Sequence, residues 1–301
     1  MSAWPAEPAH GAARRVEAAP GLRLAALGER LLPLVLVAPA LATVLLFFVY
    51  PLSYSIYDAV FEDGRWTWAN FEKALALYGP DILLTLATVL LSLALIAVLA
   101  VAIGGYLTLG EHPGAVALLR WLYRWPLFIP FIVTAQMMRT FLAKNGMLNH
   151  ALIGLGLYTP LEAPSLLDWR GVVVAFVWKQ TPFVTLLVAG AMASLDRGYV
   201  EAARNLGAGR LRILVEILVP LVRQTLFVGL VLSFVIMLSV LSVPMMIVAG
   251  QPTLITVDMA FRITAYGDYG VANALGTISY LMTGVVAWLY LRYAVARAGR
   301  S

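Results

Sequence analysis

Six long, nearly charge-free runs of apolar residues limit what this 301-residue chain can fold into. The runs are Leu31–Tyr54, Ile82–Leu107, Trp125–Leu142, Gly171–Leu195, Thr225–Val248 and Val271–Leu291. Each approaches the ~20 residues that a helix needs to cross ~30 Å of hydrocarbon. None alternates apolar with polar residues, as the strands of a membrane barrel do. We therefore predict an all-α membrane protein with six transmembrane helices.

Composition points to the same class and argues against several others. Hydrophobic residues make up 61% of the chain and charged residues 12%, whereas soluble domains average about 45–50% and about 25%. These values exclude a soluble enzyme and a nucleic-acid-binding domain. A secreted disulfide scaffold is excluded as well, because the chain has no cysteine. We expect contact with membrane lipid and no nucleic-acid partner.

The distribution of basic residues predicts the orientation. Of the 21 lysines and arginines, 14 lie in the two tails and the even-numbered connections and 6 lie in the odd-numbered connections. The remaining one, Lys179, lies inside the fourth run. The positive-inside rule therefore places both termini in the cytoplasm. We expect tails at 1–30 and 296–301 around a six-helix domain at 31–295.

Prolines mark two of the runs. Pro126 and Pro130 should bend the third run, because proline removes a helical hydrogen bond and crowds the preceding turn. Pro244 should kink the outer part of the fifth run for the same reason. A bent span of this kind can line a solute path, although a simple packing kink is the alternative.

The connection at 196–224 is too long and too patterned for a simple turn. Asp196 is suited to cap a helix that continues through Glu201, and Gly207 is suited to a left-handed turn that ends it. A second amphipathic piece follows, and we expect Pro220 to end it before the fifth span. The pattern predicts a cytoplasmic helix-turn-helix. A linker resting on lipid headgroups is the alternative.

This connection resembles the EAA loop of inner-membrane permeases of binding-protein-dependent ABC importers. The family pattern is Glu-Ala-Ala, three residues, Gly, nine residues and Ile-x-Leu-Pro. The matching residues are Glu201, Ala202, Ala203, Gly207, Ile217 and Pro220. Val219 replaces the leucine of the pattern, which is a mild apolar change. The segments Gly146–Asn149 and Trp178–Phe183 resemble the family more weakly.

The resemblance implies a permease in a bacterial inner (plasma) membrane, with a coupling loop that docks on a cytoplasmic ATPase. It implies two such ATPase subunits, an extracytoplasmic solute-binding protein and a second permease. We expect that second permease to be distinct, giving a heterodimer, although a homodimer is possible. The sequence places the ATP site elsewhere, because none of Lys73, Lys144 and Lys179 follows glycine as a P-loop lysine does. We expect no enzyme activity and no cofactor in this chain, with ATP bound by the partner ATPase.

Candidate residues for the solute path lie in the spans. Lys179 is charged and deep in the fourth run, where it should face a cavity or a polar partner. A structural hydrogen bond to backbone freed at Pro182, or a snorkelling side chain, is the alternative. The other candidates are Gln180, Thr181, Pro244 and Gln136.

The sequence leaves several functions to weigh. We expect a carbohydrate or related polar solute, since Trp178–Phe183 resembles sugar permeases. The polyamine and phosphonate branch is the alternative, because Asn205–Ala208 resembles it more. A self-sufficient secondary transporter or channel would need acidic residues inside the spans, and the predicted spans contain none. A membrane enzyme lacks a catalytic constellation, and the three scattered histidines show no metal-binding spacing.

Overall fold

The computed structural model describes residues 35–62 and 64–298. The expected N-terminal tail at 1–30 therefore lies outside the described residues, as does the end of the C-terminal one. Contacts divide the chain between Tyr54 and Ser55 into two units, and each is described by itself. The first unit is helical from Val35 and contains the π-helical turn η1 (Leu45–Val49) and the start of α2 (Tyr50–Val60).

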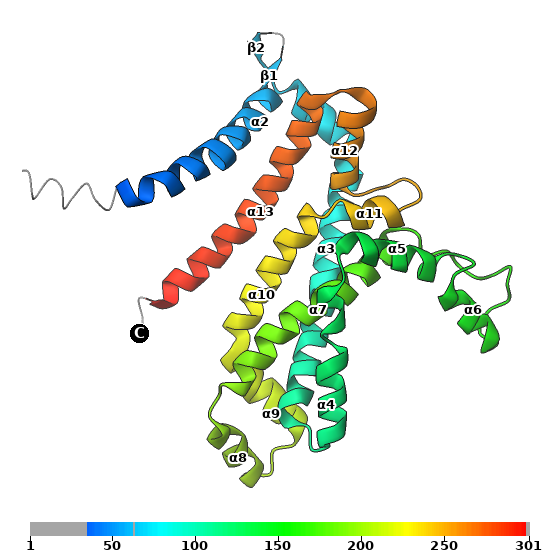
Figure 1. The fold of residues 1–301 in the computed structure, drawn as a ribbon, viewed down its shortest axis with the longest axis vertical. Coiled ribbons are helices and arrows are strands. Elements are labelled where there is room, and N and C mark those ends of the chain that lie inside the picture. Colours follow the sequence, from blue (N-terminus) through cyan, green and yellow to red (C-terminus); the bar gives the residue numbers. More distant parts are fainter. Residues whose placement is uncertain (1–34, 63, 299–301) are drawn as a thin grey trace, which may run out of the picture. The chain divides into compact units, whose positions relative to one another are not determined.

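The second unit is almost entirely helical in its described part (Figure 1). After the end of α2 its elements are β1 (Phe61–Glu62), β2 (Arg65–Trp66), α3 (Ala69–Leu109), α4 (Pro113–Leu122), η2 (Trp125–Phe128), α5 (Phe131–Leu142), α6 (Met147–Gly154), α7 (Trp169–Ala193), α8 (Arg197–Asn205), α9 (Arg210–Ile213), η3 (Leu214–Leu218), α10 (Val219–Ser239), α11 (Ser242–Ile247), α12 (Ile255–Tyr266) and α13 (Tyr269–Ala298). The two strands form an antiparallel hairpin that pairs Phe61 with Trp66 and Glu62 with Arg65.

The helices bear out the predicted membrane class. The described residues contain five helices long and apolar enough to span a membrane: Val35–Val60, Ala69–Leu109, Trp169–Ala193, Arg210–Ser239 and Tyr269–Arg292. A bent pair, Pro113–Phe128 with Phe131–Gly154, gives the sixth if it counts as one span. Two helices extend beyond the predicted apolar runs. α3 begins at Ala69, well before Ile82, and α13 continues to Ala298, past Leu291.

The third span is broken where its prolines lie. The two helices of the pair differ in direction by 108°, so Trp125–Leu142 is not a single straight span. Pro126 lies in the short 3-10 helix η2, and Pro130 is the N-cap of α5 with extended backbone. Proline cannot donate to the preceding turn, and the residue before it avoids helical geometry. Ile129, directly before Pro130, is accordingly extended.

The fifth span differs from the prediction at both ends. Pro220 does not end a separate helix, because helix continues from Arg210 to Ser239. The turn before Pro220 is the π-helix η3, in which Val219 N–H bonds to the carbonyl of Leu214, five residues back. This wider turn accommodates the proline. The helix then ends at Ser239, and Pro244 lies in the first turn of α11, where its missing N–H breaks no helical bond, so it does not kink the span.

α3, α7 and α10 pack together and form the main core. Small residues allow the close approach. A Cβ at Gly104 would lie 3.4 Å from Val188, and one at Gly229 would lie 3.3 Å from Val184, both on α7. Helices in lipid associate by such close packing, because lipid supplies no hydrophobic force between them. This core holds the ends of α7 and α10, and α8 connects them at one end of the unit (Figure 1).

Candidate functional site

α8 begins as the sequence predicts. Asp196 is its N-cap, and the Asp196 Oδ1 accepts a 2.9 Å hydrogen bond from the amide of Gly198. This bond satisfies one of the amides that have no partner in the first turn of a helix. The helix that follows carries the Glu-Ala-Ala segment in its middle.

The same helix ends at the predicted glycine. Gly207 has a φ of +79°, in the left-handed region that favours glycine. Its amide bonds to the carbonyl of Arg204 at 2.9 Å, and the amide of Ala208 bonds to the carbonyl of Ala203 at 3.0 Å. This pair of bonds is a Schellman motif, which satisfies carbonyls at the helix end and fixes the direction of the chain beyond it. Asp196 and Gly207 thus set both ends of α8.

The residues of the Glu-Ala-Ala segment lie in different surroundings. Ala203 is buried and packs against the main core, whereas Glu201 and Ala202 are exposed. Two large apolar side chains of the same region are also exposed, Tyr199 at 55% and Leu206 at 89%. α8 therefore anchors itself through Ala203 and presents Tyr199, Ala202 and Leu206, which we call the outer face of α8. Clustered exposed apolar groups are typical of an interaction surface.

The remaining motif residues lie beyond α9. Ile217 is partly buried and packs against the main core, and Pro220 is exposed. α3 approaches this segment closely, because a Cβ at Gly105 would lie 2.7 Å from a methyl group of Leu214. Ile217 thus packs η3, the turn directly before α10, against the core. Only part of the motif is therefore on the surface.

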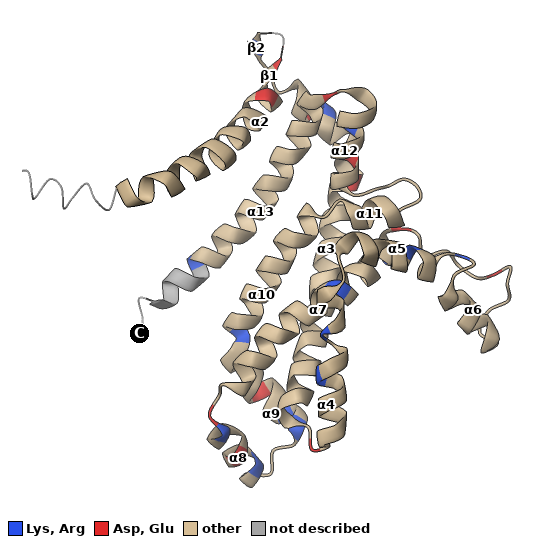
Figure 2. Ribbon diagram, in the orientation of Figure 1, with Lys and Arg blue, Asp and Glu red and all other residues tan. Residues whose placement is uncertain are grey.

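A cavity of about 750 Å³ lies beside α8, bounded by the end of α3, by α4 and by the end of α7. Glu201 and Arg204 of α8 line it, together with Arg120 and Arg124 from the α4 side. An ion pair between Arg210 and Glu111 ties α9 to the segment before α4. Figure 2 shows the basic residues on α4, α8 and α9 at this end of the unit.

Lys179 is buried in α7 and holds the break of the third span. Its Nζ donates hydrogen bonds to the carbonyl oxygens of Pro126 and Ile129, each at 2.6 Å, and of Leu127 at 3.3 Å. It also lies 5.2 Å from the centre of the Phe131 ring. The freed backbone that it binds is that of η2 and the residue after it, and not backbone at Pro182 as the structural alternative expected. The Pro126 carbonyl also accepts the amide of Ile129 at 3.3 Å, whereas the break leaves the carbonyls of Leu127 and Ile129 without a backbone donor.

The other path candidates lie on α5, α7 and α11, and none of them is a hydrogen-bond partner of Lys179. Gln180 and Thr181 are buried in α7, Gln136 is exposed on α5, and Pro244 is buried in α11. α11 packs on both α5 and α7. The structure therefore places the candidates on three neighbouring elements around the break.

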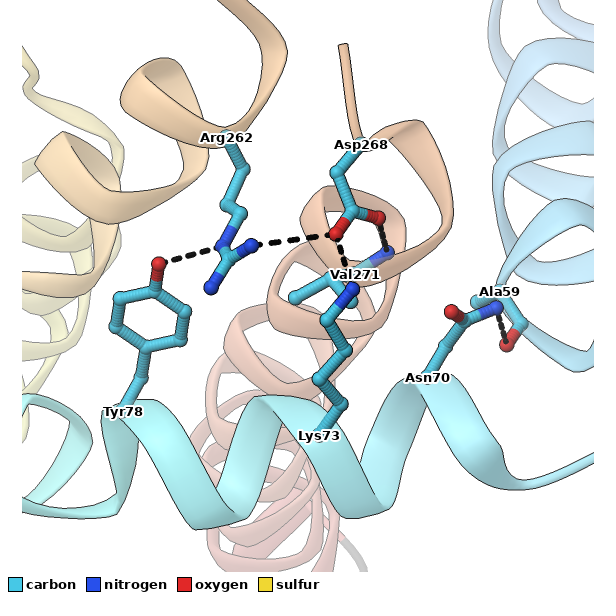
Figure 3. Close-up of polar contacts among 7 residues, drawn as sticks. All are labelled: Ala59, Asn70, Lys73, Tyr78, Arg262, Asp268 and Val271. Carbon is cyan, nitrogen blue, oxygen red and sulfur yellow. Dashed lines mark hydrogen bonds and ion pairs between the residues drawn. The ribbon is translucent and has the colours of Figure 1, made fainter. Parts of the chain in front are cut away.

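The sequence analysis missed a polar cluster at the other end of the unit, formed by Lys73, Tyr78, Arg262 and Asp268 (Figure 3). Asp268 accepts a 2.6 Å hydrogen bond from Lys73 and a 3.3 Å bond from Arg262, whose Nε also donates to the Tyr78 hydroxyl at 2.5 Å. Burial works to raise the pKa of Asp268, but the bonds from Lys73 and the Val271 amide and the two positive charges outweigh it, so the pKa lies below its usual value. The cluster joins α3 to the turn between α12 and α13.

A second buried group fastens the start of α12 to α3. The Asp81 carboxylate accepts from the Thr253 amide at 2.9 Å, the Thr85 hydroxyl accepts from the Ile255 amide at 2.9 Å, and the Thr253 hydroxyl donates to Asp258 at 2.7 Å. Burial raises the pKa of Asp258 to about 6. Asp81 lies in α3 immediately before the predicted run Ile82–Leu107, because α3 begins earlier than predicted. At that position its carboxylate holds the backbone amide of Thr253.

No sequence signal pairs these groups, since about 170 to 195 residues separate the partners of the longest-range bonds. One local signal existed for each acid. Asp81 directly precedes an apolar run, and Asp258 lies within one of low charge. An isolated acid in such a setting predicts a satisfied polar contact but does not identify its partner.

The comparisons with known proteins agree with this geometry. The chain matches the family described as "Binding-protein-dependent transport system inner membrane component" over residues 18–298. It is 25% identical to the sulfoquinovosyl glycerol transport system permease protein SmoG of Agrobacterium fabrum, over 88% of this chain and 91% of that protein. It is 26% identical to the trehalose/maltose transport system permease protein MalF of Thermococcus litoralis, over 88% and 94%.

Solved structures share the fold. A chain of a bacterial ABC transporter involved in the import of the acidic polysaccharide alginate superimposes with a TM-score of 0.75, at 20% identity, over 91% of this chain and 99% of that one. A chain of the MetNI methionine ABC transporter superimposes with a TM-score of 0.57, at 17% identity, over 75% and 98%. The family match covers nearly the whole sequence, so this chain belongs to the inner membrane components of binding-protein-dependent transport systems and is a permease of an ABC importer.

Proposed function

We propose that this chain forms half of the path of an ATP-driven importer and is coupled to its ATPase through α8. A capped helix between two spanning helices, with its direction fixed by the turn at Gly207, supports this role. The outer face of α8, together with the exposed carboxylate of Glu201, is the surface we assign to the ATPase. Motion of the ATPase would reach the spans through Ala203 and Ile217, which are packed into the core.

The complete importer in this proposal has four further subunits. A second, distinct permease closes the path, because one set of spans cannot surround a solute; a homodimer is the alternative. Two ATPase subunits bind ATP, and this chain binds neither ATP nor another cofactor. A solute-binding protein delivers the solute at the opposite end. One of the solved alginate importer structures is described as a complex with an alginate pentasaccharide-bound periplasmic protein, which is a parallel for this arrangement.

The orientation follows from the same assignment. We place α8, α9 and the start of α4 in the cytoplasm, together with both termini. α8 and α9 contain Arg197, Arg204, Arg210 and Arg212, which agrees with the positive-inside rule. The cluster of Lys73, Arg262 and Asp268 then lies at the outer end.

We propose a carbohydrate as the solute. Two relatives that match over most of both chains are named for sulfoquinovosyl glycerol and for trehalose and maltose. The spermidine/putrescine permease PotB of Escherichia coli is 29% identical, but the match covers only 57% of this chain. The extent of the match thus favours a sugar over a polyamine.

The test is Glu201→Ala in the assembled complex, with Glu162→Ala, an exposed acid of the connection between α6 and α7, as the matched control. A charge-assisted contact is worth about 1.5–3 kcal/mol, or at least about a tenfold change in affinity. We expect Glu201→Ala to lower ATPase retention on purification and ATP hydrolysis stimulated by the binding protein by that factor, with normal membrane insertion. If both variants retain the ATPase equally, α8 is a linker resting on lipid and the coupling proposal is wrong.

A further inference from the structure

Two arginines that the coupling proposal does not use, Arg120 and Arg124, line the cavity beside α8. These two arginines lie opposite residues of α7 that include Leu186 and Ala189. Counted from Pro113, they lie roughly 10 Å and 16 Å along the chain at 1.5 Å per helical residue. They therefore fall inside Pro113–Phe128, the first half of the bent span. Both side chains are exposed in this subunit, so a ligand in the cavity can reach them.

The carboxylates on this cavity form no ion pair with Arg120 or Arg124 in the described part of the chain. Glu111 pairs with Arg210, Asp196 caps α8, and Glu201 lies on α8 itself. Among the described residues, Arg120 has no hydrogen-bond or ion-pair partner. The guanidinium of Arg124 bonds to the hydroxyl of its neighbour Tyr123 at 3.2 Å and lies over the same ring. Among the described residues, neither Arg120 nor Arg124 thus has an ion-pair partner, although Glu111, Asp196 and Glu201 also line the cavity.

We propose that this cavity binds the anionic group of the solute, so that the imported carbohydrate is an acidic one bearing a carboxylate or a sulfate. The inference rests on the proposed function, because it assigns the cavity to the solute path. Guanidinium groups bind such anions through two parallel hydrogen bonds. The cavity volume of about 750 Å³ lies within the range of about 300–1,000 Å³ that is usual for small-molecule sites. Leu186 and Ala189 supply apolar surface for a sugar ring.

An anionic lipid headgroup is the competing source of negative charge. Arg120 and Arg124 also border a shallow groove formed with Trp121, Trp125 and Phe128. That groove is apolar apart from the two arginines and suits an acyl chain. The cavity has polar groups on several sides, including Tyr123 and Thr108, and so suits a hydrated solute. The experiment must separate the two.

A single cysteine can report the charge of the cavity, because the chain contains no native cysteine. Ala193→Cys places the thiol on the cavity wall, and Ala115→Cys places it at an exposed position of α4 outside the cavity. In the complete complex in phosphatidylcholine nanodiscs, the thiols react with anionic sulfonatoethyl or cationic trimethylammonioethyl methanethiosulfonate. Mass measurement of this chain gives the rates. We expect the anion-to-cation rate ratio at Ala193→Cys to exceed that at Ala115→Cys by about tenfold.

Substitution then assigns the effect to the arginines. Arg120→Gln and Arg124→Gln, each in the Ala193→Cys background, should bring the ratio towards that of Ala115→Cys. Arg223→Gln, which removes an exposed arginine of α10 outside the cavity, should leave it unchanged. Methyl β-D-glucuronide should slow the anionic reaction at Ala193→Cys more than methyl β-D-glucoside does, and Arg120→Gln should abolish that difference.

Two results would overturn the proposal. Equal rate ratios at the two cysteines would show that the cavity does not attract anions. Loss of the anionic preference on adding phosphatidylglycerol, with no protection by the glucuronide, would show that the arginines bind lipid. Retention of the ATPase in the same preparations reports on the coupling proposal separately, so failure of one inference is distinguishable from failure of the other.

Discussion

The ammonium nitrogen of Lys179 lies 2.6 Å from the carbonyl oxygen of Ile129, the residue at which the third span breaks. Through this bond and the one to Leu127, a side chain of α7 satisfies two carbonyls that the break leaves open. Its third bond goes to the Pro126 carbonyl, which also accepts the Ile129 amide. The charge within the fourth span is thus explained by the backbone of its neighbour. A change at the break should therefore alter the surroundings of Lys179, and a change at Lys179 should alter the structure of the break.

Lys179→Met should destabilise the protein, because the freed carbonyls would lose their donor. Hydrogen bonds to charged groups contribute about 1.5–3 kcal/mol. We expect a lower apparent thermal midpoint of the purified complex, together with reduced transport. Lys144→Met, at an exposed position beyond α5, is the matched control and should leave the midpoint unchanged. Equal midpoints for the two variants would show that the bonds to η2 contribute little.

Gly207→Ser should weaken coupling, whereas Gly209→Ser should not. Gly207 has a φ of +79°, where a side chain is strained by about 1–3 kcal/mol. Gly209 has a φ of −70° with extended backbone and is the N-cap of α9, a position that serine favours. The same substitution two residues apart therefore separates strain from added bulk. ATPase retention on purification is the measurement, and similar retention by both variants would contradict a requirement for the left-handed turn.

Asp258 should give the protein a defined dependence of stability on pH. Its pKa is raised to about 6 from 3.8, so between these values the folded protein binds more protons than the unfolded chain. Stability therefore falls as the pH rises from about 4 to about 6. Asp258→Asn should remove this slope and can still accept the bond from Thr253. Apparent thermal midpoints of both proteins across this interval test the prediction, which parallel curves would refute.

The two cations on Asp268 should contribute unequally. Arg262 is 11% exposed, bonds to Tyr78 and lies over the rings of Tyr78 and Tyr266, whereas Lys73 is 51% exposed. Exposed ion pairs contribute about 0–1 kcal/mol, because water screens them. Arg262→Met should therefore lower the thermal midpoint clearly, and Lys73→Met only slightly. The reverse order would contradict the importance of burial in this cluster.

The features that the sequence predicted are those encoded by neighbouring residues. The spans follow from runs of apolar residues, and the ends of α8 follow from an N-cap aspartate and a glycine in the left-handed region, eleven positions apart. The cluster around Asp268 joins residues 195 positions apart, and local pattern carries no information on such pairs. Pro220 misled the prediction because a π-helical turn, which depends on packing, accommodates it. The partner of Lys179 was hidden for the same reason, since the break that exposes it lies in another span.

The central claim is that α8 contacts the ATPase, and site-directed cross-linking tests it most directly. Because the chain lacks cysteine, Ala202→Cys on the outer face of α8 and Ala265→Cys at an exposed position of α12 can each be labelled with a benzophenone maleimide in the complete complex. On illumination, we predict a cross-link from Ala202→Cys to the ATPase subunit and none from Ala265→Cys. Absence of the ATPase from the Ala202→Cys product, or its presence in the Ala265→Cys product, would contradict the account.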